Sequence, residues 1–311
     1  MRIVFLGVGG GVPSLSRALP ALAVTIDGRV LLWDCGEGTQ MQLQRAGLSL
    51  QRITEIYISH LQGDHVLGLP GLLSSMTLLR RSKPLLVFGP QTVKTFVQTT
   101  LELTQVEPEF KLEVREVNAG IVFRHPNYVM EALPAIHSVP SLSFVLRVAD
   151  APGHFDPSKA HRLGVPQGPL WKQLQQGRSV RTPVGRTATP VEVLGPPQKG
   201  AIIAYSGDTA PNSDFAVATH GASLLIHDAT FAQVHAAKAA EYLHSTATQA
   251  AEIAKQAMAR QLALVHISPR YQSTKQHQEE AQAILARSVA PNDLDVLEIR
   301  SHLPARAASE S

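Results

Sequence analysis

The chain has 311 residues, of which 44% are hydrophobic and 17% charged, a composition typical of a globular protein with a sizeable core. No run of eighteen apolar residues occurs, so we expect no transmembrane helix, and the short apolar run after Met1 predicts a first strand rather than a signal peptide. The net charge of +3 is too small to indicate nucleic-acid binding by itself. The single cysteine, Cys35, excludes an intrachain disulfide, and we expect it to be a small core residue.

Strand and helix patterns alternate along the first hundred residues, as they do in α/β proteins. Strand patterns occupy residues 2–7, 22–27, 30–36, 53–60 and 84–90. Helix patterns occupy residues 38–48, 69–81 and 91–103. Four further strand patterns with tight connections fill residues 110–148, and they predict an antiparallel set.

Residues 150–198 have a different character, with eight prolines, six glycines and little strand pattern. They predict an extended excursion with at most one short helix, at residues 169–176. Between Asp150 and Arg186, six basic residues stand against two acidic ones, a net charge of +4 that exceeds the +3 of the whole chain. A long basic segment outside the core suits contact with a phosphate backbone, and a solvated loop is the alternative.

Regular α/β order returns after residue 198. Strand patterns lie at residues 200–208, 222–228 and 261–268, and a helix pattern at 246–259 has Ser245 or Thr246 as its expected N-cap. The small, polar tail of residues 304–311 is expected to fray.

Five apolar runs end in a histidine or an aspartate. They place the following residues at strand ends: His60, His137, Asp208, Asp228 (preceded by His227) and His266. Strand ends on one edge of a layered α/β domain are where ligands converge, so we expect these side chains to approach one another.

The stretch YISHLQGDHVLGLPG adds two more ligand types to His60 on the same short loop, namely Asp64 and His65. Neutral imidazole nitrogen and carboxylate oxygen are zinc ligands, so this spacing predicts a metal site. The long-range partners expected to close the shell are His137, Asp208 and His266. Gln62 stands where another histidine is expected, and a neutral amide oxygen is a poorer zinc ligand than imidazole.

The remaining histidines lie in polar or turn-like sequence. We expect the following at the surface rather than at the metal: His125, His154, His161, His220, His235, His277 and His302.

Nearly the whole chain resembles ribonuclease Z, the tRNA 3′-processing endonuclease family of the metallo-β-lactamase fold. The blocks that carry the resemblance are FLGVGGGVPS, DCGEGTQMQL, SHLQGDHVLGLPGLL, AIHSVPSLSFVLR, GVPQGPLWKQLQQG, YSGDT, HDATF, HSTATQAA and VHISPRY. SHLQGDH corresponds to the family's His-x-His-x-Asp-His motif, with Gln62 at its second histidine. The resemblance implies an α/β fold, the αββα sandwich. It also implies one domain over residues 1–311, with a protruding basic tRNA-binding arm inserted at about 150–198.

The resemblance further implies two zinc ions and a metal-bound hydroxide that attacks the phosphodiester, removes the 3′ trailer of precursor tRNA and leaves a 3′-hydroxyl. The first zinc would take His60, residue 62, His137 and Asp208. The second zinc would take Asp64, His65, Asp208 and His266, with Asp208 bridging. Because only the first site uses Gln62, we expect that site to be weakened beside a well-formed second one.

The family's other roles fall on matching residues of this chain. Asp64 would steer or deprotonate the attacking water, and His244 would protonate the leaving oxygen. Asp228 would orient His244, although the family usually has a glutamate there. The residues expected to bind tRNA are Lys159, Arg162, Lys172, Arg178 and Arg270, of which Arg270 has an alternative role as a strand cap. The resemblance also implies a cytoplasmic homodimer.

Two alternatives stay open. Because Gln62 replaces a ligand, the chain is alternatively a tRNA-binding relative with weak or no catalysis. It is otherwise a small-molecule phosphodiesterase or lactonase of the same fold, although a small substrate needs no remote basic segment.

Overall fold

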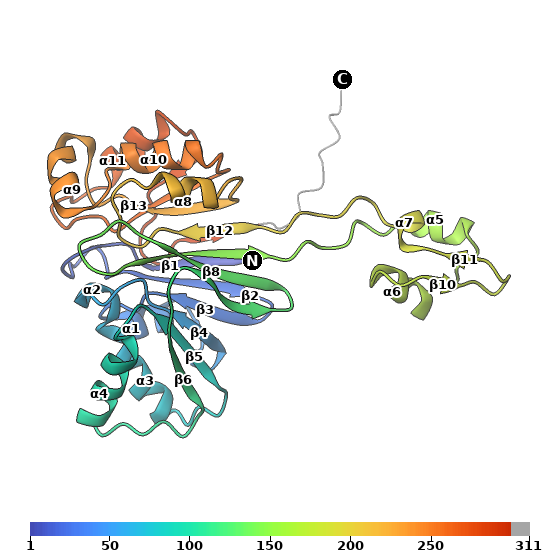
Figure 1. The fold of residues 1–311 in the computed structure, drawn as a ribbon, viewed down its shortest axis with the longest axis horizontal. Coiled ribbons are helices and arrows are strands. Elements are labelled where there is room, and N and C mark those ends of the chain that lie inside the picture. The colour runs from blue at the N-terminus through green and yellow to red at the C-terminus, as the bar shows by residue number, and fades with distance from the viewer. Residues whose placement is uncertain (300–311) are drawn as a thin grey trace. The chain divides into compact units, whose positions relative to one another are not determined.

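The computed structural model describes residues 1–299, so the expectations for His302 and for residues 304–311 lie outside it. The described chain divides into two compact units, residues 1–147 with 202–299 and residues 148–201. The larger unit contains two seven-stranded sheets (Figure 1). Within residues 1–299, no helix is both long and apolar enough to cross a membrane.

The first sheet takes six strands from the N-terminal part of the chain and one from the C-terminal part. Its order is β16 (Val296–Glu298), β1 (Arg2–Gly7), β2 (Ala21–Ile26), β3 (Arg29–Trp33), β4 (Ile53–Tyr57), β5 (Leu85–Gly89) and β6 (Leu112–Glu116). Strands β3 to β6 are parallel, because a helix follows each of β3, β4 and β5 and returns the chain. These helices are α1 (Thr39–Arg45), α3 (Gly68–Leu78) and α4 (Val93–Leu103).

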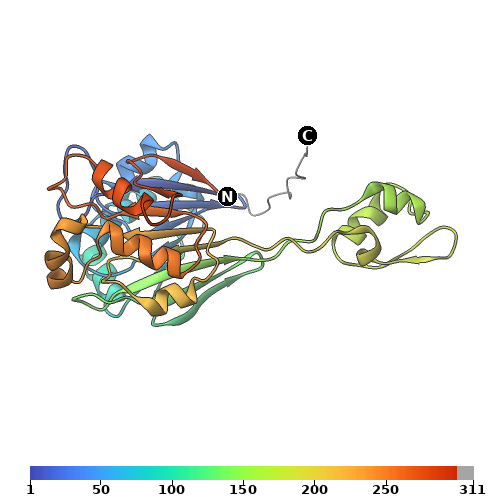
Figure 2. The same ribbon diagram turned by 90° about the horizontal axis from the view of Figure 1, so that it is seen from above.

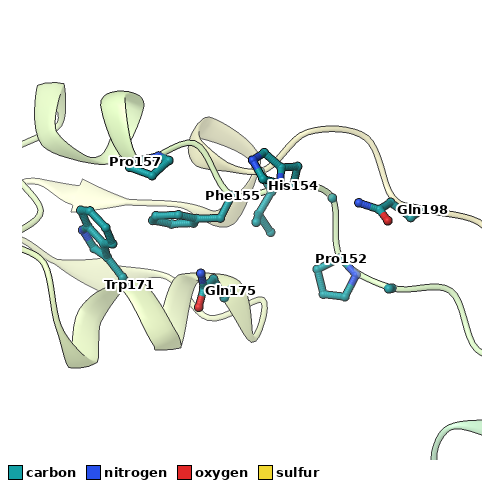
Figure 3. Close-up of a pocket in the computed structure, with 10 residues that line it drawn as sticks. Pro152, His154, Phe155, Pro157, Trp171, Gln175 and Gln198 are labelled. Carbon is teal, nitrogen blue, oxygen red and sulfur yellow. The ribbon is translucent and has the colours of Figure 1, made fainter. Parts of the chain in front are cut away.

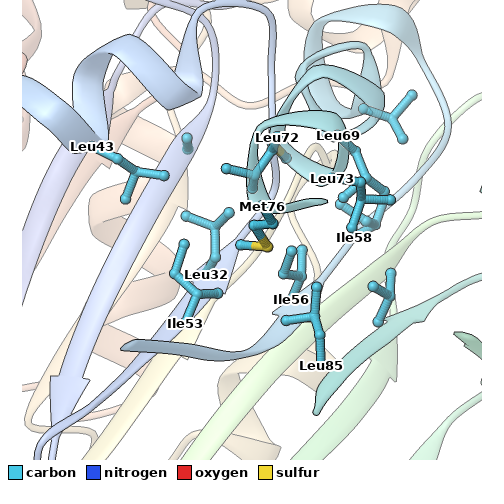
Figure 4. Close-up of a cluster of buried hydrophobic side chains, with 14 of the residues drawn as sticks. Leu32, Leu43, Ile53, Ile56, Ile58, Leu69, Leu72, Leu73, Met76 and Leu85 are labelled. Carbon is cyan, nitrogen blue, oxygen red and sulfur yellow. The ribbon is translucent and has the colours of Figure 1, made fainter. Parts of the chain in front are cut away.

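One face of this sheet packs under those helices. Leu43 of α1 and Leu72 and Met76 of α3 lie against Leu32 and Ile56 of the strands (Figure 4). All five side chains are fully buried. This core holds the carboxyl ends of the parallel strands in place, and β4 leads directly into the candidate metal loop.

The second sheet comes from residues 120–148 and 202–289. Its order is β15 (Ser288–Val289), β14 (Leu262–Val265), β13 (Leu224–Asp228), β12 (Ile202–Tyr205), β9 (Leu142–Val148), β8 (Tyr128–Pro134) and β7 (Gly120–His125). Strands β12 to β15 are parallel. An alanine-rich core joins them to α8 (Ser213–Ala218), α10 (Ala247–Gln256) and α11 (Lys275–Gln282). These helices, orange to red, lie over the strands when the ribbon is seen from above (Figure 2).

Aromatic rings join the two sheets face to face. Trp33 of the first sheet stacks on Tyr205 of the second, with ring centroids 5.9 Å apart. Tyr57 of the first meets Phe144 of the second at 5.4 Å. The layers are therefore helix, sheet, sheet, helix, and the expected αββα sandwich is confirmed.

Several local expectations need correction. Residues 110–148 do not form one antiparallel set, because β6 pairs in parallel with β5 while β7, β8 and β9 join the second sheet. The cause is α4, which carries the chain back before β6. The N-cap of α10, expected at Ser245 or Thr246, is Thr246, whose side chain accepts from the Gln249 amide N–H. In the larger unit, the short elements that the patterns did not predict are α2 (Gly63–Val66), α8, α9 (Ala236–Tyr242), α11, β15, β16 and two 3-10 helices, η1 (Leu50–Arg52) and η2 (Gln233–His235).

Residues 148–201 are not the extended excursion that their composition predicts. They form α5 (Pro157–Arg162), the expected α6 (Pro169–Gln175), α7 (Pro190–Val193) and a hairpin of β10 (Val180–Arg181) and β11 (Thr187–Ala188). Proline stands in the first turn of each helix, where it starts a helix instead of breaking one. This unit has its own core, made of Phe155, Ala160, Val165, Leu174, Val180, Ala188 and Val193.

A pocket of about 470 Å³ opens beside that small core. Phe155 and Trp171 line it, with ring centroids 5.1 Å apart, and Pro152, His154 and Gln198 lie at its other end (Figure 3). The small unit is therefore a folded element with an aromatic hollow.

Candidate metal centre

The strand ends of both sheets deliver the predicted ligands to one place. His60 follows β4, and Asp64 and His65 lie in the single turn of α2. His137 follows β8, Asp208 follows β12 and His266 follows β14. Each sheet contributes to the cluster, so the site forms only when the two sheets pack together.

Four residues form the tighter half of the cluster. Asp208 lies between two imidazoles, with Oδ1 3.3 Å from His65 Nε2 and Oδ2 3.1 Å from His266 Nε2. Asp64 Oδ2 lies 3.2 Å from His266 Nε2 and 3.6 Å from His65 Nε2. Two ligands at about 2.0–2.1 Å from a tetrahedral zinc ion lie roughly 3.3 Å apart, so these spacings fit one ion.

Hydrogen bonds behind the rings aim their Nε2 atoms at the centre. His65 Nδ1 lies 2.8 Å from Asp34 Oδ2, and His266 Nδ1 lies 2.7 Å from Thr230 Oγ1. Thr230 Oγ1 in turn donates to Asp228 Oδ1 at 2.7 Å. Carboxylate or hydroxyl partners of this kind fix the tautomer and the ring orientation of metal-binding histidines.

Two buried atoms in this half, His65 Nε2 and Asp208 Oδ1, lie 3.3 Å apart without hydrogen-bond geometry and have no other partner among residues 1–299. Buried polar atoms without a partner are costly unless an ion or a water satisfies them. The donor set of two imidazoles and two carboxylates is one that zinc accepts. Asp64, His65, Asp208 and His266 therefore fit a metal ion.

The other half of the cluster is different. His60 Nε2 is 3.8 Å from Asp208 Oδ2, farther than His65 Nε2 and His266 Nε2 are from the same carboxylate. Between His60 and His137 lies the Gln62 side chain, whose amide end, Oε1, is 3.0 Å from His60 Nε2 and 2.9 Å from His137 Nε2. His60, Gln62, His137 and Asp208, which were predicted to surround the first zinc, lie together. The Gln62 side chain occupies the space between the Nε2 atoms of the two histidines.

Charge and burial set the protonation of the cluster. Burial and the neighbouring His65 lower the pKa of His60 to about 4, and burial also lowers the pKa of His137. Burial opposes a charged His65, but Asp208 and Asp34 outweigh it and hold the pKa of His65 well above its usual value. A proton and a metal ion therefore compete for His65 Nε2, so metal binding there would release a proton.

Next to the metal cluster lies a histidine–aspartate pair, His244 with Asp228. His244 Nδ1 is 2.7 Å from Asp228 Oδ2, so the aspartate reaches its partner despite being one methylene shorter than glutamate. Burial lowers the pKa of His244, but Asp228 more than compensates and raises it to about 9. The amide N–H groups of Thr209 and Thr230 donate to Asp228 and fix it.

A pocket of about 410 Å³ gives access to the centre. His137, His244 and His266 line it, together with Arg270 and the glycine loop at residues 10–11. A Cβ atom on Gly10 would lie 2.3 Å from the His266 ring, so only glycine fits there. The N–H of Gly11 donates to Asp64 Oδ2 at 2.7 Å.

The proposed substrate-binding residues are all exposed: Lys159, Arg162, Lys172, Arg178 and Arg270. The first four lie in the small unit, which holds seven basic residues against three acidic ones, a net charge of +4. Arg270 lies over the Phe231 ring at 4.9 Å, on the pocket of the centre.

Other predictions have mixed outcomes. Cys35 is fully buried and burial raises its thiol pKa to about 12, so it is a core residue as expected. The expectation of a surface His277 is wrong, because the ring is fully buried against Tyr271 at 4.5 Å between centroids. His277 belongs to α11, whose polar sequence gave no sign of that contact.

Asp34 is the functional residue that sequence reasoning missed. It accepts from Ser59 Oγ and Tyr205 Oη and also contacts His65. The signal was present, because Asp34 follows an apolar strand just as Asp208 does.

Known proteins are similar to nearly the whole chain. A family model described as Anti-Pycsar protein Apyc1 matches residues 1–151, less than half of it. Ribonuclease Z of Bacillus licheniformis is 38% identical over 305 residues, which cover 96% of this chain and 99% of that protein. The crystal structure of human tRNase Z, short form, is 27% identical with a TM-score of 0.72, and the match covers 96% of this chain and 100% of that one. The metallo-β-lactamase fold protein YhfI of Bacillus subtilis has a TM-score of 0.68 at 16% identity, covering 95% of this chain and 98% of that one.

Proposed function

The chain belongs to the ribonuclease Z family of endoribonucleases, and on that premise we propose that it removes the 3′ trailer from precursor tRNA and leaves a 3′-hydroxyl. The observation that supports this proposal most is that two groups of residues lie side by side in one cluster, with His244 of one and His266 of the other lining the same pocket. One group, Asp64, His65, Asp208 and His266, offers metal ligands. The other, Asp228 with His244, offers a proton.

Zinc is the metal that we propose for the site. The four ligands of the tighter half would hold it, and their spacing and unpartnered atoms support that assignment. A zinc ion there would polarise the phosphodiester and lower the pKa of a coordinated water. The first site, with His60, Gln62 and His137 around Asp208, would be the weaker one, since Gln62 is neutral and contacts both histidines.

The chain's own acid and base groups have separate roles in the proposal. Burial would raise the pKa of Asp64, but His266 and His65 hold it well below its usual value, so Asp64 stays a carboxylate. A carboxylate of such low pKa orients a water toward phosphorus better than it takes a proton from it. His244, protonated near neutral pH, would donate its Nε2 proton to the departing 3′ oxygen while Asp228 holds Nδ1.

Precursor tRNA is the proposed partner of the small unit. Its exposed residues Lys159, Arg162, Lys172 and Arg178 would contact phosphates along the tRNA body, and the net charge of +4 supports this. Arg270, on the pocket of the metal centre, would contact a phosphate near the cleaved bond. The separate compact unit of residues 148–201 supports the proposal that residues 150–198 are the inserted tRNA-binding arm.

A second candidate function is tRNA binding with weak or no catalysis. The observation that favours it is the contact of Gln62 with two ligand histidines. A small-molecule phosphodiesterase or lactonase receives less support, because a separate basic unit has no role in that reaction. The cytoplasmic homodimer implied by the resemblance stays a prediction, which sedimentation of the full chain and cell fractionation would test.

Cleavage of precursor tRNA by metal-depleted protein, with Zn²⁺ or Mn²⁺ added back, tests the proposal. We expect no cleavage without metal, cleavage after addition and a product that ends in a 3′-hydroxyl. Gln62→His, assayed alongside, is expected to cleave faster than the unchanged chain. Tight tRNA binding without cleavage at any metal concentration would instead support the second candidate.

A further inference from the structure

Gln62 is more than a missing ligand, because its amide fills the space that a first metal would need. One end of the amide contacts both ligand atoms of the first site, at 3.0 Å from His60 Nε2 and 2.9 Å from His137 Nε2. A half-turn of the amide exchanges Oε1 with Nε2 and leaves its outline unchanged, so the protons on the two rings decide which end faces them.

The proton on His137 is fixed from the far side of the ring. Its Nδ1 lies 3.2 Å from the carbonyl oxygen of Leu243, which can only accept. Nδ1 therefore carries the proton, and the neutral ring presents a lone pair at Nε2 toward Gln62.

The proton on His60 is fixed by a chain of hydrogen bonds. Ser59 Oγ has one proton, which it donates to the carboxylate of Asp34 at 2.9 Å, since that oxygen can only accept. His60 Nδ1, 3.0 Å from Ser59 Oγ, must then be the donor in their contact. His60 therefore also presents a lone pair at Nε2 toward Gln62.

Two lone pairs facing one amide require its NH₂ end. We propose that the Gln62 NH₂ donates one hydrogen to His60 Nε2 and one to His137 Nε2, and so takes the place of the first metal ion. Both ligand histidines are satisfied without metal, and the residues of the first site do not fit a zinc ion. The chain then holds a single metal, between Asp64, His65, Asp208 and His266, and this last assignment rests on the proposed function.

Zn²⁺ titration of the metal-depleted full chain distinguishes a filled site from one that merely lacks a ligand. We expect one tight zinc per chain, and two in Gln62→His. Gln62→Ala is the decisive variant, because it removes the amide without supplying a ligand. If Gln62 blocks the site, Gln62→Ala binds a second zinc at least tenfold more tightly than the unchanged chain. If Gln62 is only a poor ligand, the second zinc binds no better, and that result would overturn the proposal.

Gln91→His is a matched control, since Gln91 lines a pocket beside Gln62 that neither His60 nor His137 lines. It is expected to leave the stoichiometry at one. Nitrogen-15 spectra of the histidines give an independent readout, with His60 and His137 expected as Nδ1–H tautomers. An Nε2–H tautomer at either ring, or two equally tight zincs in the unchanged chain, would contradict the proposal. None of these measurements needs tRNA cleavage. The inference about Gln62 can therefore fail while the proposed function stands, and the proposed function can fail while the inference about Gln62 stands.

Discussion

The orientation of single residues at the metal centre depends on hydrogen bonds from residues that lie behind them, on the side away from the ligand atoms. Asp34 accepts from Tyr205 Oη at 2.7 Å and from the Ser59 amide at 2.7 Å while it orients His65. Asp34 and His266 also have positive φ angles, 56° and 62°, which non-glycine residues rarely adopt. Such strain persists where surrounding contacts impose it, and here it places Asp34 behind the His65 ring and turns His266 Nε2 toward Asp64 and Asp208.

His244 carries the clearest prediction for a single residue. We expect His244→Ala to lower kcat on precursor tRNA by about 100- to 10 000-fold, because general acid catalysis contributes in that range, with tRNA binding little changed. Single-turnover cleavage and filter binding would measure the two effects, with His235→Ala as the control. Equal losses in cleavage and binding would count against the acid role.

The pH dependence follows from the same pair. The pKa of His244 is raised to about 9, so the proton is present at neutral pH and is lost as pH rises through about 9. The cleavage rate should therefore decline above that pH. Asp228→Asn removes the charge that raises this pKa and should move the decline to lower pH, and a decline that stays in place would be the contrary result.

The helices and strands give the large unit and the small unit different roles. Strand ends deliver metal ligands in the large unit, while three proline-started helices and a hairpin build the small one. The core of the small unit includes Phe155, Leu174 and Val193. Deleting residues 155–180 would destroy that core, so point substitutions test the unit more cleanly.

The basic side chains of the small unit can be neutralised together. We expect replacement of Lys159, Arg162, Lys172 and Arg178 by glutamine to raise KM for precursor tRNA and to spare cleavage of a small phosphodiester. Each lost phosphate contact should reduce the salt dependence of binding by about one unit of slope. The matched control is Arg186→Gln with Lys199→Gln, since both cations already pair with acids, Glu192 and Asp150. Unchanged tRNA binding at all salt concentrations would refute the assignment.

At the scale of the whole large unit, the metal ligands connect its two sheets. Asp64 and His65 follow a strand of the first sheet, and Asp208 and His266 follow strands of the second. An ion bound to all four would join the sheets at their edge, next to the stacked rings of Trp33 and Tyr205 in the interior. Metal binding would therefore be coupled to folding of the larger unit.

Metal removal tests that coupling. Zinc at 100 times its Kd should stabilise the chain by about 2.7 kcal/mol, so a chelator is expected to lower the unfolding midpoint measured by calorimetry. Asp208→Asn should abolish most of the zinc-dependent shift, whereas Asp214→Asn, an exposed acid of α8, should leave it intact. A midpoint that does not respond to zinc or chelator would contradict a metal that joins the sheets.

The sequence alone determined the alternation of strands and helices and the candidate ligands at strand ends, because both are written in local pattern. The αββα layers were implied by the resemblance to the ribonuclease Z family. His60, Asp64, His65, His137, Asp208 and His266 all lie in the centre, and the helix at 169–176 is present. Composition misjudged residues 148–201, since prolines at helix starts look like proline in loops.

Only the tertiary structure decided which way the side chains face. The orientation of His65 depends on Asp34, and the burial of His277 depends on Tyr271. The role of Gln62 depends on Ser59 and Leu243, which fix the protons of two rings from behind. Some of these contacts join distant segments, as Asp34 with His65 and Leu243 with His137 do, and others join near neighbours, as Tyr271 with His277 and Ser59 with His60 do. Local sequence pattern does not reveal either kind, because the direction of a side chain and the position of its proton are fixed only when the surrounding residues have packed.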